Sequence, residues 1–95
     1  MSDYQVLDNA AEHRFELVVD GEVGALATYH VRDGVLIILH TETAPEKRGQ
    51  GLAGRLAAGT LEIIRGRGQK VVPACPYFAR YIEEYPQYAD LVARS

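Results

Sequence analysis

The sequence predicts a single α/β domain with a mixed, mostly antiparallel sheet in the order β-β-β-β-α-β-α. Three observations support this fold class. Two Asp-Gly pairs separate apolar segments in the first half of the chain, as in β-hairpins. A glycine-rich stretch then leads into a long segment of helical periodicity. The strand after this helix is expected to run parallel to the strand before it, because a helix connects them.

The amino-acid composition indicates the class of protein and its environment. The chain has 95 residues, 47% of them hydrophobic and 24% charged, which suits one globular domain over residues 1–95. Its single cysteine excludes an internal disulfide and fits a reducing, cytoplasmic environment. The first residues lack a signal-peptide pattern, and the longest apolar run, residues 35–39, is far too short for a membrane span. We therefore expect a cytoplasmic protein without a membrane partner.

The charges are unevenly placed along the chain. The formal net charge is −3, so a broad nucleic-acid-binding face is not expected. Seven of the ten Lys and Arg residues nevertheless lie between Lys47 and Arg80. This asymmetry fits a local anion site inside an acidic protein, and it fits equally a helix with a solvated, charged face.

The first half of the chain is expected to form an antiparallel meander. Residues 4–7 are a possible edge strand. The next strand has apolar residues at alternate positions, namely Phe15, Leu17 and Val19. Asp20-Gly21 follows, and this pair favours a two-residue hairpin because both residues tolerate positive φ.

Two longer strands complete this half. Residues 22–32 are predicted to be a strand with one apolar face, formed by Val23, Ala25, Ala27, Tyr29 and Val31. Asp33-Gly34 gives a second hairpin signal. Residues 35–43 form the next strand. Its first five residues are all apolar, which suggests a central strand covered on both faces.

In the second half of the chain, apolar residues recur at the spacing of a helix rather than that of a strand. Residues 49–65 are predicted to be a helix, with Leu52, Leu56 and Ile63 on one face and Ala53, Ala57, Leu61 and Ile64 beside it. Gly66 and Gly68 are candidate C-terminal caps. Residues 70–74 form a short strand, and Pro76 can open a second helix at its first position.

The last segment is rich in tyrosine. Tyr77, Tyr81 and Tyr85 share a helical face with Phe78 and Ile82 adjacent, and this spacing is typical of side chains that pack in a core. Pro86 ends that helix, and residues 87–94 are expected to form a final helical segment.

Three glycines, Gly49, Gly51 and Gly54, lie within six residues at the start of the long helix. They satisfy the dinucleotide pattern G-x-G-x-x-G, but that fingerprint needs a first βαβ unit and an acidic residue about 20 positions on, where "KVVPAC" has none. They nearly satisfy the mononucleotide P-loop as well. There Arg55 and Leu56 stand where Lys and a Mg²⁺-binding Ser or Thr are required. No metal site is therefore expected.

A third interpretation of the three glycines also fits their place between an apolar strand and a long helix. The run Arg48-Gly49-Gln50-Gly51-Leu52-Ala53 fits the pattern (Arg/Gln)-x-x-Gly-x-(Gly/Ala), and it resembles the acetyl-CoA pyrophosphate loop of the GCN5-related N-acetyltransferases. The chemistry suits that ligand, because the first turn of a helix has unpaired N–H groups and partial positive charge. Glycines let a ligand approach the backbone closely, and Lys47 adds positive charge.

The resemblance covers nearly all of residues 15–92. The element order is similar to the core of that superfamily without its two N-terminal helices. The stretches "LHTETAPEKRGQGLAGRL" and "VVPACPYFARYIEEYPQYADLV" resemble a compact subgroup, the YjdJ-type or NATD1-like single-domain acetyltransferases. The resemblance implies a minimal acyl-CoA N-acyltransferase fold (α+β), acetyl-CoA as the acetyl donor, and an amine acceptor of unknown identity.

The resemblance also implies site residues. Backbone groups of Thr41, Glu42 and Thr43 are expected to hold the pantetheine arm and the acetyl carbonyl. Further contacts with the CoA molecule are implied for Lys47, Arg48, Gly49, Gln50, Gly51, Leu52, Ala53, Cys75, Tyr77 and Phe78.

His40 and Glu42 alternate onto one face of their strand, near the expected acetyl group. Either side chain could take the proton of the acceptor amine, directly or through water. Alternatively, His40 fills a polar site at the strand end and Glu42 faces solvent.

Cys75 and Tyr81 are the other candidate catalytic residues. Cys75 ends the short strand and precedes Pro76, where a thiol feels the positive end of a helix, which favours the thiolate. An acetyl-cysteine intermediate, proton donation to the CoA thiolate and plain packing all remain open for it. In the superfamily a tyrosine on the following helix often protonates the thiolate, which implies Tyr81, although its spacing from Cys75 departs from the usual motif.

Three functions compete at this point. The leading hypothesis is an N-acetyltransferase that moves the acetyl group to a primary amine, on a small molecule or a protein lysine, by direct transfer in a ternary complex. The second is a CoA-binding module or sensor without turnover. The third is an interaction domain whose glycine loop binds nothing.

Overall fold

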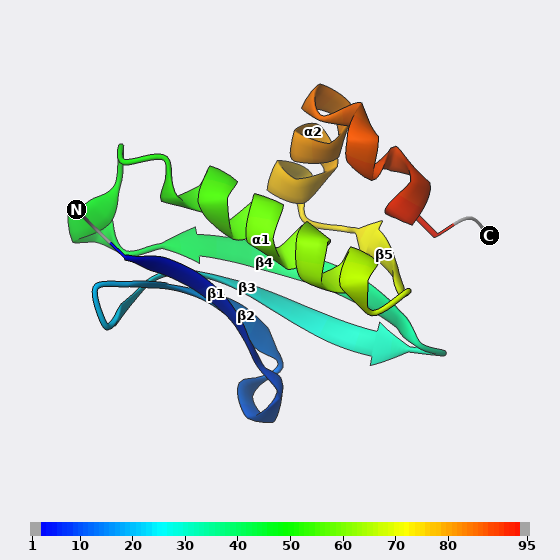
Figure 1. The fold of residues 1–95 in the computed structure, drawn as a ribbon, viewed down its shortest axis with the longest axis horizontal. Coiled ribbons are helices and arrows are strands. Elements are labelled where there is room, and N and C mark those ends of the chain that lie inside the picture. The colour runs from blue at the N-terminus through cyan, green and yellow to red at the C-terminus, as the bar shows by residue number, and fades with distance from the viewer. Residues whose placement is uncertain (1–2, 94–95) are drawn as a thin grey trace.

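The computed structural model describes residues 3–93 and contains one sheet and two α-helices (Figure 1). In chain order the elements are β1 (Tyr4–Asn9), η1 (Ala10–Glu12), β2 (Arg14–Val19), β3 (Glu22–Arg32), β4 (Val35–Thr43), η2 (Pro45–Lys47), α1 (Leu52–Gly66), β5 (Lys70–Pro73), α2 (Pro76–Glu84) and η3 (Pro86–Leu91), where η marks a 3₁₀-helix. The predicted order of strands and helices is confirmed.

The sheet has five strands in the order β1-β2-β3-β4-β5. The first four are antiparallel neighbours, and β5 pairs in parallel with β4, as expected. Both Asp-Gly turns have positive φ at both residues, 48° and 85° at Asp20-Gly21 and 52° and 78° at Asp33-Gly34. This backbone matches the right-handed twist of the flanking strands, so the hairpins form as the sequence predicted.

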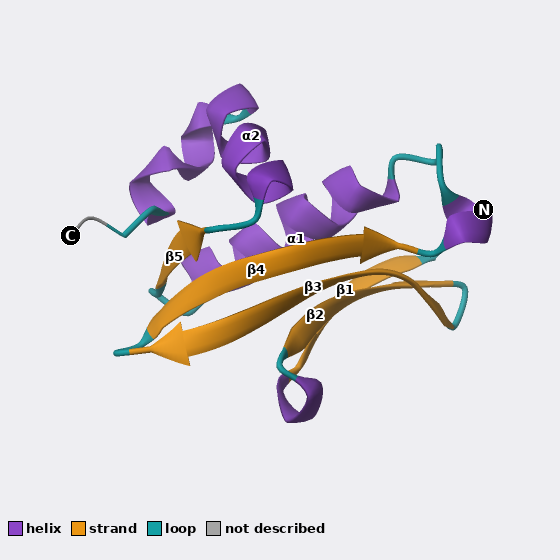
Figure 2. Cartoon of the chain, turned by 180° about the vertical axis from the view of Figure 1, so that it is seen from behind, coloured by secondary structure: helices purple, strands orange, loops and turns teal. Residues whose placement is uncertain are grey.

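Both α-helices pack on one face of the sheet. In Figure 1 α1 lies in front of the strands, and in Figure 2, seen from behind, the strands lie in front of it. A single core fills the space between them and includes Phe15, Leu36, Leu56 and Phe78, all of which are fully or almost fully buried. The expectation that β4 is covered on both faces is wrong, because Ile37 is only half-buried and no helix of residues 3–93 covers the opposite face.

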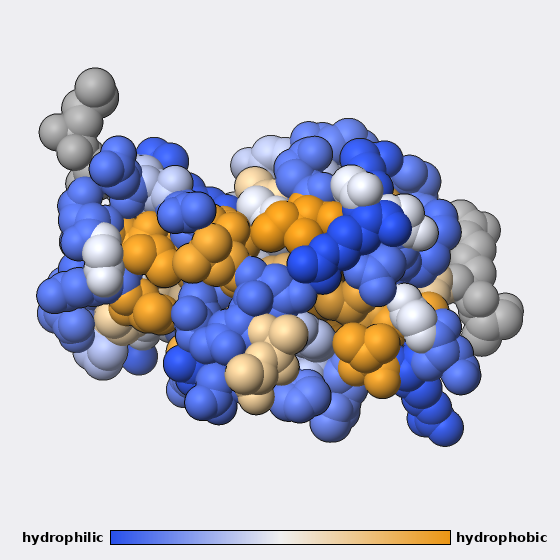
Figure 3. Space-filling model, turned by 60° about the horizontal axis from the view of Figure 1, so that its bottom comes forward, coloured by the Kyte–Doolittle hydropathy of each residue, from blue (hydrophilic) through white to orange (hydrophobic). Residues whose placement is uncertain are grey.

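Some apolar surface remains exposed. Figure 3 shows the side that lies at the bottom of Figure 1, where apolar residues, in orange, form a broken band between hydrophilic ones. The large apolar residues that keep more than a third of their surface exposed include Leu7, Val23, Val31 and Leu39.

Two β-bulges change which side chains face the core. Gly24 has no partner in β2, because Leu17 pairs with Ala25 and Val18 with Val23. Val23 therefore turns to the helix-free face, and the prediction that it shares a face with Ala25 is wrong. Leu39 is the extra residue in β4, since Thr28 pairs with His40 and Tyr29 with Ile38.

The long helix starts later than predicted. α1 begins at Leu52 rather than at Gly49, because Gly49 and Gly51 have φ of 84° and 72°, values that belong to the left-handed region. At its other end Gly68 has φ of 68°, and Gln69 N–H donates to Ile64 O over 3.1 Å, which closes the helix. Gly68 thus acts as the predicted cap, while Gly66 is the last helical residue.

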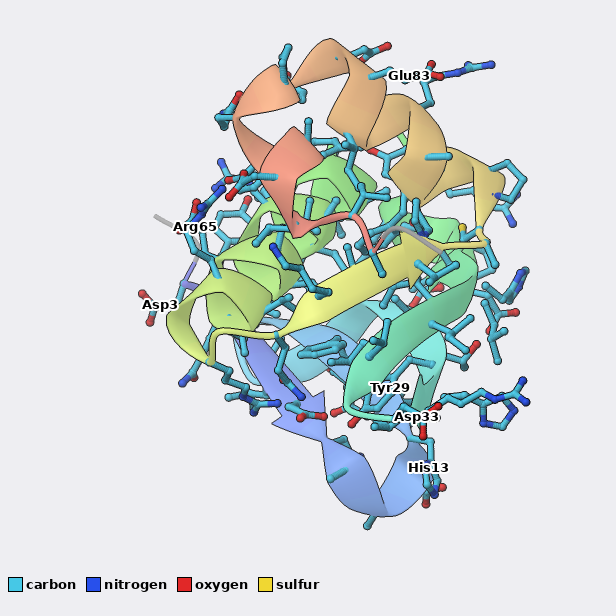
Figure 4. The ribbon with its side chains drawn as sticks, turned by 90° about the vertical axis from the view of Figure 1, so that its right-hand side faces the viewer. Asp3, His13, Tyr29, Asp33, Arg65 and Glu83 are labelled. Atoms are coloured by element: carbon cyan, nitrogen blue, oxygen red, sulfur yellow. The ribbon has the colours of Figure 1, made fainter. Side chains whose placement is uncertain are left out.

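The C-terminal segment partly departs from expectation. Phe78 is fully buried, but Tyr77 and Tyr85 are 39% and 43% exposed, so a core role for these two tyrosines is wrong. The segment after Pro86 is the 3₁₀-helix η3 rather than a helix to Arg94, which lies outside the described residues. Arg65, labelled in Figure 4, ties this segment to α1 by two hydrogen bonds of 3.0 Å to the Asp90 carboxylate.

Candidate functional site

The strands β4 and β5 part near the middle of β4. Their parallel pairing ends at Ile38 and Pro73, and Cys75 N–H donates to Ile38 O over 2.8 Å. β4 continues to Thr43, whereas the other chain segment turns away as α2 from Pro76 on (Figure 2). Pro73 and Pro76 have no N–H, so neither can extend the ladder. Residues 39–43 of β4 therefore have no strand partner on the β5 side within the described chain.

The bulge at Leu39 sorts the side chains at this strand end onto two faces. Thr41 pairs with the buried Ala27 and faces the side that carries the helices. His40 and Glu42 pair with Thr28 and Leu26 and face the opposite side. Without the bulge, the alternation that points Leu36 and Ile38 into the core would also have pointed His40 and Glu42 there.

Cys75 and Thr41 meet on the helix side. The Cys75 Sγ and Thr41 Oγ1 atoms lie 3.2 Å apart and form a hydrogen bond. Cys75 is only 4% exposed, and it occupies the N-cap position of α2, as the sequence predicted. Cys75 follows the end of β5, and Thr41 lies in the part of β4 that has no strand partner on that side. This pair therefore marks the point where the two strands separate.

His40 and Glu42 form a pair on the helix-free side. The His40 Nε2 and Glu42 Oε1 atoms lie 3.6 Å apart, and both side chains are more than 60% exposed. They line an open hollow of about 650 Å³ together with Val23, Leu26, Pro45 and Arg48, among others. The two side chains share one face, as predicted.

The glycine loop, residues 48–53, leads into a helix start whose main-chain amides are unpaired within the helix. The N-terminus of α1 has no side-chain cap, and no acidic residue lies in its first turn. The first helical bond runs from Arg55 N–H to Gly51 O, so the amides of Leu52, Ala53 and Gly54 have no partner within the helix. A Cβ atom added at Gly49 or Gly51 would meet nothing within 4 Å, so space beside the loop is open.

The third glycine lies against α2. A Cβ atom at Gly54 would lie 3.6 Å from the Tyr77 hydroxyl, an ordinary van der Waals distance, so Tyr77 is next to the first turn of α1. Tyr77 thus stands beside the glycine loop, whereas Phe78 points into the core. Lys47 lies next to this region with its Nζ atom 3.8 Å from Glu22 Oε2.

Tyr81 lies in a cluster of aromatic rings. Its ring centroid is 6.4 Å from that of Tyr77, 4.4 Å from Tyr85 and 6.2 Å from Tyr88. Burial raises the pKa of the Tyr81 hydroxyl, and the neighbouring Tyr85 and Tyr77 raise it further. The hydroxyl is therefore protonated at neutral pH. Among the described residues no hydrogen bond joins it to Thr41 or Cys75.

A family model described as GCN5-related N-acetyl-transferase matches residues 14–91, which is most of the chain. The chain belongs to this family. The fold agrees with membership, and the resemblance to the compact subgroup is confirmed.

Solved structures support the same assignment. The chain is similar to a GCN5-like protein from Staphylococcus aureus, solved in solution by NMR, with a TM-score of 0.70 and 25% identity over 100% of this chain and 93% of that one. The ribosomal-protein-S18-alanine N-acetyltransferase of Escherichia coli shares the fold, with a TM-score of 0.62 and 19% identity over 90% of this chain and 76% of that one. A comparison with curated proteins gives no match.

No cluster of three or more His, Cys, Asp and Glu side chains among residues 3–93 is arranged to hold a metal ion. None of the helices in that part of the chain has the length and apolarity needed to cross a membrane.

The sequence did not predict how the candidate residues at the end of β4 divide between the two faces of the sheet. The extra residue at Leu39 carries no turn or glycine signal, so the sequence gives no sign of the bulge. The hydrogen bond between Thr41 and Cys75 follows from that bulge, since it turns Thr41 toward the helix side.

Proposed function

We propose that the chain is an acetyl-CoA-dependent N-acetyltransferase that moves the acetyl group directly to a primary amine in a ternary complex. One observation carries the proposal: the uncapped N-terminus of α1 lies close to the end of β4 that has lost its strand partner. Gly24, which accepts a hydrogen bond from Ala44 N–H, also lies against the Leu52 side chain. The first feature suits a pyrophosphate, and the second suits an extended pantetheine arm with amide groups of its own. Membership of the family supports both assignments.

The binding residues divide by the part of the donor that they hold. The amides of residues 49–53 bind the pyrophosphate, and Lys47 and Arg48 add positive charge next to it. The free edge of β4 at Thr41, Glu42 and Thr43 pairs with the pantetheine arm as an added strand would. Tyr77 of α2 lies next to the first turn of α1, beside the proposed pyrophosphate site.

The acceptor amine reaches the thioester from the helix-free side. His40 or Glu42 takes the proton of the amine, because both side chains face the hollow there and are exposed enough to pass a proton on to solvent. The amine nitrogen then attacks the thioester carbonyl, the C–N bond forms, and the C–S bond breaks. The products are an amide and the CoA thiolate.

The leaving thiolate needs a proton, and Cys75 is placed to supply it. The thiol is buried at the strand separation and hydrogen-bonded to Thr41, on the side where the pantetheine arm would end. Tyr81 is protonated, as a donor must be, but its ring belongs to the tyrosine cluster. We therefore assign proton donation to Cys75 rather than to Tyr81.

A second candidate function rests on the open face of the sheet. No helix of residues 3–93 covers the side on which His40 and Glu42 lie, and these side chains are largely exposed. An acceptor bound there would be only partly enclosed by the protein. The same geometry suits a CoA-binding module that has no physiological turnover.

Two measurements test the proposal. Thermal unfolding with CoA should give a rising midpoint as its concentration increases to the millimolar range, because CoA binds only the native chain. Release of free CoA thiol from acetyl-CoA, followed over a panel of amines, lysine peptides and protein N-termini, should then identify an acceptor. No shift of the midpoint would overturn both candidates. A shift without turnover on any acceptor would favour the binding module.

The base is tested by substitution on the acceptor that the panel identifies. His40→Gln or Glu42→Gln should lower kcat by about a hundred-fold while leaving the Kd of CoA within a factor of two, about the range for loss of one acid–base group. Glu83→Gln on the exposed side of α2 is the matched control and should leave both constants unchanged. Full activity in both the His40 and the Glu42 variants would remove this pair from the mechanism.

A further inference from the structure

A smaller hollow of about 330 Å³ lies between β1 and α1. Tyr4, Val6 and Leu17 line it from the sheet, and Arg55 and Ile63 line it from the helix. Its walls are mostly apolar and aromatic with one charged group, and its size falls at the lower end of small-molecule sites, about 300–1,000 Å³. It lies on the opposite side of α1 from Tyr77 and α2.

Arg55 lies over the ring of Tyr4. The guanidinium carbon lies 3.9 Å from the centroid of the Tyr4 ring, which is cation–π geometry. Stacking of this kind uses the face of the guanidinium, while its N–H donors point outward in the plane. The side chain is thereby oriented without its hydrogen-bonding capacity being used.

No carboxylate of residues 3–93 pairs with Arg55. This sets it apart from Arg65 and Arg67, the other two arginines in α1 and at its C-cap, which bind Asp90 and Asp8. A guanidinium with free donors beside a concave surface is a ready anion site, and its planar fork matches the oxygens of a phosphate.

The position of Arg55 relates this site to the glycine loop. Its N–H donates to Gly51 O over 3.3 Å, so the residue lies one turn after the loop. Side chains of an α-helix tilt toward the helix N-terminus, which brings the guanidinium back toward the amides of that loop. CoA carries its pyrophosphate and its 3′-phosphate on the same ribose. A ligand whose pyrophosphate lies on the loop can therefore bring its 3′-phosphate to a side chain that lies about one helical turn, 5.4 Å, further along.

We propose that Arg55, positioned by Tyr4, binds the 3′-phosphate at the nucleotide end of CoA. This inference rests on the proposed function and adds to it a means of recognising CoA over dephospho-CoA, which lacks only that phosphate. Tyr4 acts as a positioning residue, because its ring holds the guanidinium in place.

The test compares the Kd of CoA and of dephospho-CoA by isothermal titration calorimetry. The wild-type chain should bind CoA about ten-fold more tightly, the effect of a charge-assisted hydrogen bond of ~1.4 kcal/mol. Arg55→Gln should bind the two ligands equally, at the level of dephospho-CoA. Tyr4→Leu should lower the ratio in part. Arg32→Gln, which removes an exposed charge at the far end of β3, should keep the full ratio.

The outcomes separate this inference from the proposed function. If the wild-type chain binds neither ligand, the proposed function fails. If it binds both with equal Kd, only the role of Arg55 is wrong. Retention of the ratio in Arg55→Gln and its loss in Arg48→Gln would move the 3′-phosphate to Arg48 and overturn the inference. Far-UV circular dichroism and the unfolding midpoint confirm that each variant is folded.

Discussion

Cys75 and Thr41 are 34 residues apart in the sequence, and the hydrogen bond between them gives the site its centre. A thiol that is 4% exposed and has a hydroxyl partner is held in one orientation. An orientation of this kind matters for a proton donor, since transfer needs the donor within hydrogen-bond reach of the acceptor. Glu16 is a second residue whose position the sequence did not explain, because a carboxylate that is 8% exposed needs partners.

Cys75→Ala should lower kcat with the acceptor by about a hundred-fold and change the Kd of CoA by less than two-fold, because only the proton donor is lost. Cys75→Ser, which keeps a donor, should recover part of the activity. Mass spectrometry of the wild-type chain incubated with acetyl-CoA alone should show no acetyl adduct. A stable adduct on Cys75 would replace proton donation by a covalent acetyl-enzyme, and full activity of the alanine variant would remove Cys75 from the mechanism.

Glu16 accepts hydrogen bonds from Asn9 Nδ2 over 3.0 Å and from Arg14 Nε over 2.7 Å. The bond from Asn9 and then that from Arg14 hold the pKa of Glu16 below its usual value of 4.5, despite burial. The stability that this carboxylate contributes is present above that value and is lost as the pH falls through its lowered pKa.

Glu16→Gln should therefore lower the free energy of unfolding at pH 7 by about 1.5–3 kcal/mol, the usual contribution of a hydrogen bond to a charged group. Urea unfolding at a series of pH values should show this difference shrinking as the pH drops below 4.5. A difference that stays constant down to pH 2 would contradict the role of the ionised carboxylate.

At the scale of elements, glycine decides how closely α1 packs. A Cβ atom at Gly59 would overlap Val6 Cγ2 and lie 2.8 Å from Val6 Cβ, so β1 contacts the helix backbone directly. The same residue type has another use at Gly49 and Gly51, where the left-handed backbone ends the loop and frees the first-turn amides. A helix with three glycines in its pattern is intrinsically weak, and contacts with the sheet compensate for this.

Gly59→Ala should destabilise the chain by about 1–3 kcal/mol, because the added methyl group overpacks against Val6. This loss outweighs the gain of about 1 kcal/mol in helix propensity. Urea denaturation gives the measurement, and Gly66→Ala is the matched control, since a Cβ there meets nothing within 4 Å. The double change Val6→Ala and Gly59→Ala should recover part of the stability. An alanine at Gly59 as harmless as one at Gly66 would show that the contact with β1 is loose.

At the scale of the whole molecule, two buried tyrosines join separate parts of the chain. Tyr29 on β3 donates to Asp8 on β1, which also accepts from Arg67 after α1. Tyr88 on η3 donates to Glu62 on α1 over 2.7 Å. Burial, and then these carboxylates, raise the pKa of each tyrosine from 10.0 to about 12.

The neutral hydroxyls stabilise the fold, so their contribution to the free energy of unfolding should be constant below pH 10 and should fall as the pH rises toward about 12. Tyr29→Phe and Tyr88→Phe should each flatten this alkaline fall, as measured by urea unfolding from pH 8 to 11.5. Tyr4→Phe, which alters an exposed hydroxyl, is the control. A fall of equal steepness in wild type and both variants would contradict the assignment.

Local backbone preferences and periodicity were enough to predict the order of the elements, both hairpins, the parallel β5 and the glycine loop. Pro76 likewise predicted that Cys75 lies at the start of α2. The face that each side chain occupies could not be predicted in this way, because it depends on contacts between elements. A bulge such as Leu39 reverses the alternation of a whole strand end, and its cost and benefit arise from packing against neighbouring strands rather than from the bulged residue itself. The exposure of Tyr77, the contact between Thr41 and Cys75, and the stacking of Arg55 on Tyr4 were hidden in the sequence for the same reason.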